Sequence, residues 1–167
     1  MDFSVKIEGL EKLTKQMTVM APLINAELDK ALFISAKKVE EEAKRSIAEG
    51  NKSGKIYTHF LLTNKRTGGI FPSRLRDKPH RASAPGQAPA QDSGALSRSI
   101  NTRVQKSAKE ALIVAGNSLA KYARFLEFGT SKIAARPFMV PALEKSKAFI
   151  RARLNEAVDT AIKKVTK

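Results

Sequence analysis

Glycine and proline fix the backbone of one stretch, KYARFLEFGTSKIAARPFMVPALE from Lys121 to Glu144, and this stretch constrains the fold more than any other. Gly129 follows a helical repeat, and a glycine there typically ends a helix because it enters the left-handed region without a steric penalty. Pro137 and Pro141 follow, and a residue before proline is pushed toward extended geometry. The stretch therefore predicts a short helix that ends at Gly129, a stiff apolar connector, and a second helix with Pro141 as its first residue.

The apolar residues of this stretch predict which side chains are buried. Tyr122, Phe125 and Leu126 recur at three- and four-residue spacing, which places an aromatic and aliphatic stripe on one face of the short helix. Large apolar side chains are more often buried in a core than exposed in a ligand site, with a subunit interface as the alternative. We therefore expect a core role for the large residues around the connector: Phe128, Phe138 and Met139.

The first fifty residues predict one strand and two helices. Apolar and polar residues alternate from Phe3 to Ile7, which is the two-residue period of a half-buried strand. A helical period runs from Leu10 to Met20 and stops at Pro22. A longer helix is expected from about residue 23 to Gly50, with one apolar face that consists of Ile24, Leu28, Ala31, Leu32, Ser35, Val39, Ala43 and Ile47.

Carboxylates in two places need an explanation. Glu40 to Glu42 precede a lysine and an arginine at helical spacing, so we expect ion pairs on an exposed helix side. Glu127 is the one carboxylate within the most apolar stretch of the chain. Because buried charges are usually paired, it is expected to accept hydrogen bonds from nearby backbone or to pair with Arg124 or Arg136.

Residues 50–92 change character, because glycines and prolines are frequent there and long apolar runs are missing. Ile56 to Leu62 and Gly69 to Phe71 favour strands, which predicts a hairpin on an extended arm. From His80 to Gln91 small residues and prolines leave little to bury, so no ordered core role is expected. A connection of this length in a compact domain is usually functional or disordered. We interpret it as an arm that orders against a neighbour.

The second half of the chain predicts two strands and two helices. Leu96 to Gln105 and Glu110 to Ala115 have strand composition and are joined by a short turn. Asn117 and Ser118 are candidate caps for the short helix before Gly129. The last helix is expected from about residue 141 to 165, with one apolar side that consists of Leu143, Phe149, Ile150, Leu154, Val158, Ile162 and Val165.

Length and element order predict a single domain over residues 1–167. Strands and helices are mixed without regular βαβ alternation, which favours an α+β fold. We expect a small, mainly antiparallel sheet packed by helices, with a long basic loop or hairpin arm inserted at residues 50–92. No apolar run is long enough for a membrane span, and no signal peptide is recognisable at the N-terminus.

The charge of the chain points to its partners. Thirty-one Lys and Arg stand against 16 Asp and Glu, for a formal net charge of +15. Eight of these basic residues but only one acid, Asp77, lie between residues 51 and 81, where Tyr57, Phe60 and Phe71 alternate with them. Such a segment contacts DNA phosphates, docks on an acidic protein surface, or is a solvated loop. No recognised nucleic-acid motif accompanies it.

The residues that catalysis would need are scarce. The chain has no cysteine, which excludes disulfides and thiolate metal sites, and its two histidines, His59 and His80, lie in the basic insertion without a carboxylate pair nearby. Gly68 and Gly69 lack the Lys-Ser or Lys-Thr ending of a phosphate-binding loop. No His, Asp or Glu cluster has metal-ligand spacing. We expect a protein that is not an enzyme and that needs no cofactor.

Three motifs in a fixed order resemble a known family. They are SAPGQAP from Ser83 to Pro89, DSGALSRSI from Asp92 to Ile100, and L-E-F-G-T followed by R-P-F-M-V-P-A-L within the stretch that ends at Glu144. In order and spacing they resemble the tail-completion or head-tail joining (neck) proteins of long-tailed bacteriophages. The residues that carry the last motif are Tyr122, Leu126, Glu127, Phe128, Gly129, Thr130, Pro137, Phe138 and Pro141.

The resemblance implies a structural virion protein made in the host cytoplasm. It implies a homo-oligomeric ring at the head-tail interface that completes the tail and joins it to the head connector. The implied partners are further copies of the chain, head-connector or adaptor proteins, and tail-tube or tail-terminator proteins, with no membrane. Positive charge suits a ring around the DNA channel, where it allows non-specific contact with DNA.

The predicted contact residues lie mainly in the arm. The candidates for a subunit or partner interface are Lys52, Lys55, Tyr57, Phe60, Lys65, Arg66, Phe71, Arg74, Arg76, Arg81, Pro85, Gly86 and Phe138. The main alternative is a free-standing basic protein that binds nucleic acid non-specifically. A second alternative, a toxin or hydrolase, requires turnover that depends on His59 or His80.

Overall fold

The computed structural model describes residues 10–57, 61–63, 70–72, 80–118 and 120–165 of the chain. Two long helices dominate it: α1, Leu10–Ala48, and α4, Met139–Val165. Two short helices, α2 (Ala95–Ser99) and α3 (Ala123–Phe128), and an antiparallel hairpin of β5 (Asn101–Gln105) and β6 (Glu110–Val114) complete the body. These elements confirm the α+β class. The strand predicted from Phe3 to Ile7 lies outside the described residues.

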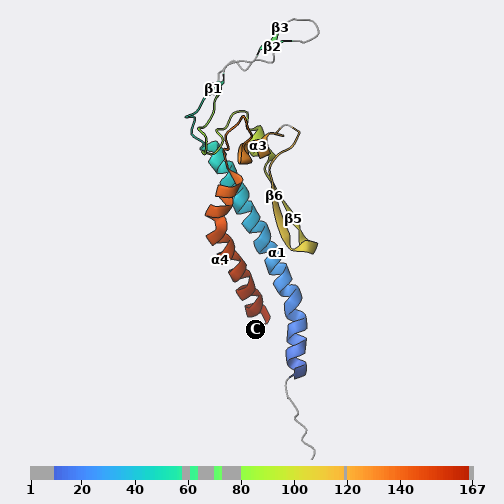
Figure 1. The fold of residues 1–167 in the computed structure, drawn as a ribbon. Helices are drawn as coiled ribbons and strands as arrows, with labels where there is room; N and C mark the ends of the chain where they lie inside the picture. Colours follow the sequence, from blue (N-terminus) through green and yellow to red (C-terminus); the bar gives the residue numbers. More distant parts are fainter. Residues whose placement is uncertain (1–9, 58–60, 64–69, 73–79, 119, 166–167) are drawn as a thin grey trace, which may run out of the picture.

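The helices α1 and α4 run antiparallel, side by side (Figure 1). Lys145, near the start of α4, lies 3.3 Å from the Glu42 carboxylate near the end of α1. Lys164, at the other end of α4, lies 2.8 Å from Glu27. Hydrogen bonds from Lys164, and then from Lys30, lower the pKa of Glu27. Polar contacts at both ends thus fix the alignment of the pair, and α1 extends past the end of α4 (Figure 1).

Small residues form the packed side of α4. Ala142, Ser146, Ala157 and Ala161 are buried, whereas Leu143, Phe149, Val158 and Ile162 remain 36–42% exposed. The predicted apolar side is therefore buried only in part: Ile150 packs against the core and Leu154 is half-buried. The four exposed residues lie outside the close contact with α1, because small side chains let two helix axes approach closely.

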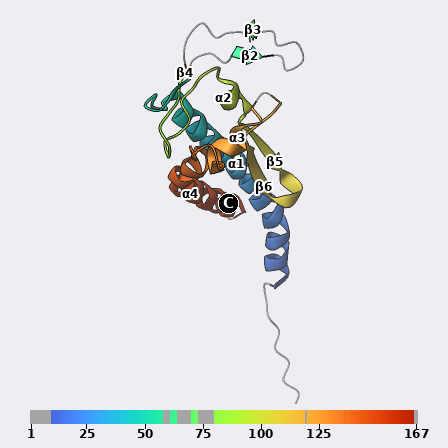
Figure 2. The same ribbon diagram turned by 45° about the horizontal axis from the view of Figure 1, so that its top comes forward.

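The hairpin β5–β6 packs on α1 as well, so α1 lies between α4 and the hairpin (Figures 1 and 2). Asn101 faces Val114 and Gln105 faces Glu110 in its register. Alternate residues of both strands are half-buried toward α1, which is the expected two-residue period. Lys109, in a left-handed conformation at the turn, donates a 2.8 Å hydrogen bond to Asp29.

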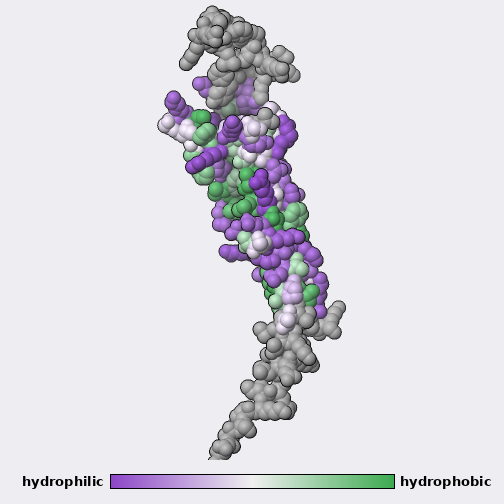
Figure 3. Space-filling model, turned by 90° about the vertical axis from the view of Figure 1, so that its right-hand side faces the viewer, coloured by the Kyte–Doolittle hydropathy of each residue, from purple (hydrophilic) through white to green (hydrophobic). Residues whose placement is uncertain are grey.

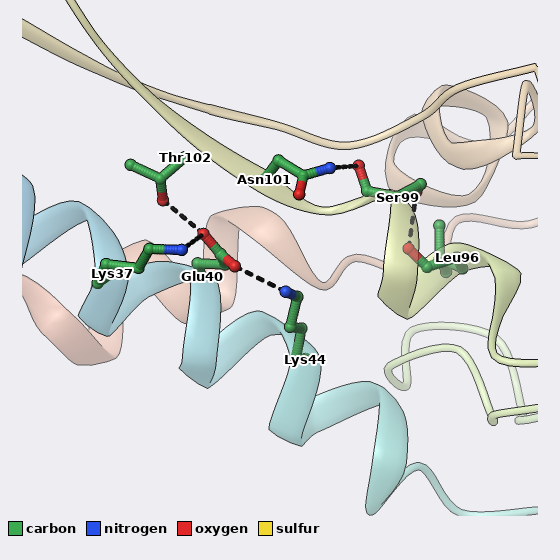
Figure 4. A network of polar contacts seen from close by, with 7 residues as sticks. All are labelled: Lys37, Glu40, Lys44, Leu96, Ser99, Asn101 and Thr102. Atoms are coloured by element: carbon green, nitrogen blue, oxygen red, sulfur yellow. Dashed lines mark hydrogen bonds and ion pairs between the residues drawn. The ribbon is translucent and has the colours of Figure 1, made fainter.

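Glu40 joins the hairpin to α1 (Figure 4). Its carboxylate accepts hydrogen bonds from Lys37 at 2.8 Å, Lys44 at 2.6 Å and Thr102 of β5 at 2.6 Å. Burial alone would raise the pKa of Glu40, but these three hydrogen bonds lower it from 4.5 to about 2. The predicted ion pairs of Glu40 and Glu42 form, yet both carboxylates are 5% exposed instead of solvated, because α1 is covered on two sides.

The two helices predicted before Gly50 form a single helix, α1. Helix α1 continues through Pro22, although proline removes one helical hydrogen bond and was expected to end the first helix. Pro22 is exposed, whereas Leu23, Ile24 and Leu28 are half-buried, so the ring lies on the outer side, where it displaces no packing. The apolar face predicted after residue 23 is confirmed by the burial of Ala31, Ser35, Val39, Ala43 and Ile47.

The predicted strand from Leu96 begins late, because residues 95–99 form α2. The Arg98 backbone N–H donates to the Gly94 carbonyl at 3.0 Å, and the Ser99 hydroxyl donates to the Leu96 carbonyl at 2.7 Å. This turn places Leu96 and Ile100 in the core with Val39, Ala43, Ile47, Ala123, Phe138 and Ala142.

The arm consists of two small antiparallel pairs beyond the C-terminal end of α1 (Figures 1 and 2). Strand β1 (Ile56–Tyr57) pairs with β4 (His80–Arg81), and β2 (Leu61–Thr63) pairs with β3 (Ile70–Pro72). The predicted hairpin is therefore present. The predicted strand from Ile56 to Leu62 is divided between two pairs with different partners.

Candidate functional site

The carboxylate of Glu127 holds the start of α4. Helix α3 carries it, and it accepts hydrogen bonds from the backbone N–H groups of Phe138 at 2.8 Å, Met139 at 3.0 Å and Val140 at 2.9 Å. The first N–H groups of a helix have no partner within the helix, and a negative charge at that end is favourable. Pro141 follows and has no N–H to satisfy. Glu127 thus caps α4 from a different helix.

This cap confirms the predicted backbone role of Glu127 and corrects the connector. Met139 and Val140 were expected to be extended before Pro141, but α4 begins at Met139. The helix can start before the proline because the cap supplies an acceptor for each N–H in the first turn. Pro141 is therefore the third residue of the helix, where its ring is still tolerated.

Gly129 ends α3 as predicted. Its φ of 74° is left-handed, and its N–H donates to the Phe125 carbonyl at 2.9 Å. A Cβ at this position would lie 2.9 Å from the Ala135 nitrogen and 2.9 Å from the Ile133 carbonyl oxygen, so only glycine fits. Thr130 shapes the next turn, because its hydroxyl oxygen accepts hydrogen bonds from the N–H groups of Lys132 and Ile133.

The loop at residues 83–89 is fastened to the connector. The Arg136 guanidinium donates from Nε to the Ser83 carbonyl at 3.1 Å, and the Gly86 N–H donates to the Ala135 carbonyl at 2.8 Å. The Arg136 backbone N–H donates to the Leu126 carbonyl at 2.6 Å. Ser83 and Pro89 are buried and this loop is ordered, which was not expected for His80 to Gln91, although no residue of that segment belongs to the hydrophobic core cluster. Contacts with a distant segment, which composition does not reveal, order this loop.

The three motifs found in the sequence therefore meet at one place. Ser99 links the second motif to the turn after β6, because its hydroxyl oxygen accepts the Gly116 N–H at 3.1 Å. Asn117 accepts the Ala120 N–H at 3.0 Å, in the turn before α3. The predicted cap at Asn117 is wrong for α3 itself, whose N-cap position is Tyr122 and has no side-chain hydrogen bond. We call the meeting point of residues 83–100 and 122–141 the motif junction.

Aromatic residues of the junction divide into one buried and three exposed. Phe138 is 1% exposed in the core, as predicted for a core residue, so in the isolated chain it presents no surface to a neighbour. Phe128 is 73% exposed, Phe125 50% and Tyr122 41%. The core role predicted for Phe128 is wrong because α3 is short and turns Ala123 and Glu127 inward. Of the predicted stripe, Leu126 alone packs against the core.

The described part of the arm exposes its basic residues. Lys52, Lys55 and Arg81 are exposed, and Arg81 donates from Nε to the Gly54 carbonyl at 3.2 Å. Pro85 and Gly86 are also exposed, at a turn where Gly86 has a φ of 79°. The side chains of Tyr57 and Phe71 lie outside the described residues, as do five candidate residues entirely: Phe60, Lys65, Arg66, Arg74 and Arg76.

The described residues include His80 and carboxylates from several elements. Within them no three His, Asp or Glu side chains come together as metal ligands. His80 lies 3.5 Å from Asp92 across the base of the arm, and His59 falls outside the described part. None of the helices in the described ranges has an apolar window that would cross a bilayer.

Comparison with known proteins gives one family. The family model described as "Bacteriophage HK97-gp10, putative tail-component" matches residues 11–129. No curated protein and no solved structure matches the chain. The matched range contains α1, the arm, the hairpin and α3, which is more than half of the chain and most of the motif junction. The chain therefore belongs to the HK97-gp10-like family of bacteriophage tail components, and it is a structural phage protein.

Proposed function

We propose that this tail component is a non-enzymatic protein of the phage neck. Copies of the chain form a ring that completes the tail and joins it to the head connector around the DNA channel. The neighbours are head-connector or adaptor proteins on one side and tail-tube or tail-terminator proteins on the other. Family membership supports a virion tail component, and the surface of the chain supports the ring.

The exposed apolar side of α4 carries this proposal. Val140, Leu143, Val158 and Ile162 are 36–52% exposed, and at 100° per residue they fall on one side of the helix as two pairs, with the exposed Lys147 and Arg151 between them on that side. We call them the α4 stripe. Burial of these side chains against a partner is favourable by about 25 cal/mol per Å². A closed ring needs two different faces on each copy, and the α4 stripe supplies one.

The basic arm supplies a contact at the end of the body. Its described pairs lie beyond the C-terminal end of α1, at the end of the body where α4 begins (Figure 1). In the proposed ring the arm reaches a neighbouring copy or the adjoining ring, and its Lys and Arg side chains meet acidic protein surface or channel DNA.

Native mass spectrometry and electron microscopy of the purified chain test the ring. Val158→Glu and Ile162→Glu place a charge on the α4 stripe and should leave monomers. Ala152→Glu adds the same charge at an exposed position on another side of α4 and should assemble like the wild type. A wild-type chain that stays monomeric when mixed with purified tails and heads would contradict the proposal.

The net charge of +15 favours a second candidate, a free-standing protein that binds nucleic acid non-specifically. That candidate requires tight binding of duplex DNA by the isolated chain at physiological salt, with an affinity that falls steeply as salt increases. The neck proposal instead requires assembly with tails or connectors and only weak DNA affinity. Fluorescence anisotropy with a labelled duplex over a salt series separates the two.

A further inference from the structure

The hairpin β5–β6 has an outer edge that no strand covers in the described part of the chain. There it forms a two-stranded sheet, in which β5 pairs with β6 alone. Alternate backbone N–H and C=O groups of an edge strand point away from its partner, so β5 can accept one further strand. A hairpin of two short strands has little stability of its own, and a third strand over an apolar surface would stabilise it. The edge of β5 is therefore a candidate contact surface.

An exposed apolar residue of α1 lies beside this edge. Phe33 is 49% exposed, and at about 100° per residue it falls within about 20° of Glu40, which binds Thr102 of β5. The other strand, β6, lies on the core side, because Ile113 packs against the core. Phe33 also lines the open groove between α1 and α4. It therefore lies between the β5 edge and that groove, where a strand added to β5 would cover it.

The face of the hairpin that is turned away from α1 is mixed in polarity. Its exposed residues are Asn101, Arg103 and Gln105 of β5 and Leu112 and Val114 of β6. Figure 3 faces this side of the molecule and shows hydrophobic and hydrophilic residues interspersed. A strand that joins β5 therefore needs apolar side chains toward α1 and polar side chains on the outer face, which is the alternation of a half-buried strand.

The strand predicted from Phe3 to Ile7 of the chain itself has this alternation. Its apolar residues are separated by Ser4 and Lys6. The segment lies outside the described residues and precedes α1, which begins at Leu10. It is therefore the one part of this chain with a sequence-predicted strand that is not already assigned to a described element.

Charge selects the register of the added strand. With Ser4 opposite Arg103, both a parallel and an antiparallel strand place Phe3 and Val5 toward α1, beside the half-buried residues of β5. Residues 2–6 then cover the whole of β5. A shift by two residues would place Lys6 opposite Arg103, where like charges repel.

The segment cannot reach the β5 edge of its own chain. Lys109 at the hairpin turn binds Asp29 at 2.8 Å, so the hairpin ends level with Asp29. Helix α1 is continuous from Leu10 to Asp29, which is a rise of about 28 Å at about 1.5 Å per residue. The chain from Lys6 to Leu10 spans at most about 14 Å. The start of α1 projects past α4 and the hairpin (Figure 1), so it is open to a neighbouring molecule.

We infer that residues 2–6 of one copy add as a third strand to the β5 edge of the next copy. Backbone hydrogen bonds pair the two strands, and Phe3 and Val5 cover Phe33 of the receiving copy. The receiving copy passes its own segment to a third copy, so the contact is heterologous and repeats by rotation, as a ring requires. The inference rests on the proposed ring and deepens it by giving neighbours a contact besides the α4 stripe.

Disulfide cross-linking tests the contact, because the chain has no cysteine of its own. Ser4→Cys in one chain and Arg103→Cys in a differently tagged chain are mixed where the wild type assembles, and the mixture is oxidised. Neighbouring strands lie about 5 Å apart, within the range of a disulfide, so a dimer with both tags is expected on a non-reducing gel. Leu112→Cys is the matched control: Leu112 faces Arg103 in the register, one strand further away at about 10 Å, and should give no cross-link.

A chain with both Ser4→Cys and Arg103→Cys separates a neighbour's edge from its own edge. In an excess of wild-type chain, each cysteine of this variant meets a neighbour without cysteine. We therefore expect the cross-link to disappear on dilution with the wild type. A cross-link within one chain that survives the dilution would overturn the inference.

Val5→Asp tests which side of the added strand faces α1. It places a charge on the apolar side and should weaken self-assembly about tenfold in native mass spectrometry. Ser4→Asp adds the same charge on the outer face, opposite Arg103, and should assemble like the wild type. Both positions precede α1, so the melting temperature of the chain should not change. Equal assembly of the two variants would contradict the proposed pairing.

The outcomes distinguish this inference from the neck proposal. Chains that assemble without the cross-link at Arg103, or with an equal one at Leu112, overturn the strand exchange and leave the ring in place. A wild-type chain that stays monomeric with tails and heads contradicts the neck proposal, and the strand exchange with it.

Discussion

The motif junction and the arm are built in opposite ways. At the junction, side chains from distant segments bind backbone groups directly: Glu127 caps three N–H groups of α4, and Arg136 holds the Ser83 carbonyl. In the arm, the described strands are two or three residues long, and the β1–β4 pair is extended only by backbone hydrogen bonds between residues 54–55 and Ala82 among the described residues. A two-stranded pair of this size has little stability of its own in water. The junction therefore determines the fold, and the arm is suited to contact.

The largest expected effect is at the core of the junction. Phe138→Ala leaves a cavity among Val39, Ile100 and Ala142 and should reduce the free energy of unfolding by about 4 kcal/mol. Phe128→Ala, in the same motif but 73% exposed, should change it by less than about 0.5 kcal/mol. Chemical denaturation of both variants measures the difference. Similar losses would show that Phe128 packs in the chain.

The next effect tests the cap. Glu127→Gln keeps the shape of the side chain but replaces one acceptor oxygen with an amide donor, so one or two N–H groups of α4 lose their partner. We expect a loss of about 2–3 kcal/mol, with fraying at the start of α4 visible by amide hydrogen exchange. Glu144→Gln, at an exposed i,i+3 pair with Lys147, serves as the matched control and should be nearly neutral. A Glu127→Gln variant with the same free energy of unfolding as the wild type would contradict the capping role of Glu127.

A smaller and pH-dependent effect comes from Glu40. The pKa of its carboxyl falls from 4.5 to about 2 on folding, so the ionised form stabilises the fold at pH values above 4.5 and this contribution is lost as the pH falls toward 2. Glu40→Gln should cost about 1–2 kcal/mol at neutral pH. Urea unfolding over a pH series should show that the gap in the free energy of unfolding between variant and wild type becomes smaller as the pH falls. A gap independent of pH would contradict the role of the ionised carboxylate.

The smallest effect on stability is expected from the arm. Replacing residues 58–79 with a short Gly-Ser linker keeps the pairing of β1 with β4 and should change the free energy of unfolding of the body by less than about 1 kcal/mol. Differential scanning calorimetry compares the two chains. A large loss would mean that the arm packs on the body and that the comparison between arm and junction is wrong.

Local signals in the sequence predicted the elements that depend on local chemistry. Gly129 ends α3, alternation gives β5 and β6, and the apolar spacing of α1 identifies its buried residues. Glu127 was recognisable as a carboxylate that needs donors, because it stands alone in an apolar stretch. These features require no knowledge of distant neighbours.

The features that sequence reasoning missed depend on contacts between distant segments. Whether Pro22 ends a helix depends on which side of α1 it occupies, and the start of α4 at Met139 depends on a carboxylate twelve residues earlier. The outward orientation of Val158 and Ile162 follows from small residues that face α1, and periodicity alone gives no weight to alanine over valine. A cavity of about 320 Å³ at the motif junction has walls from five segments, so no single motif in the sequence predicts it.

An assay of head-to-tail joining tests whether the arm makes the contacts that the proposed neck function requires. Purified heads and tails from phage that lack this protein are mixed with wild-type chain or with the chain in which the linker replaces residues 58–79, and joined particles are counted by negative-stain electron microscopy. We predict efficient joining with the wild-type chain and very few joined particles with the folded, arm-less chain. Equal joining by the two chains would contradict this role of the arm.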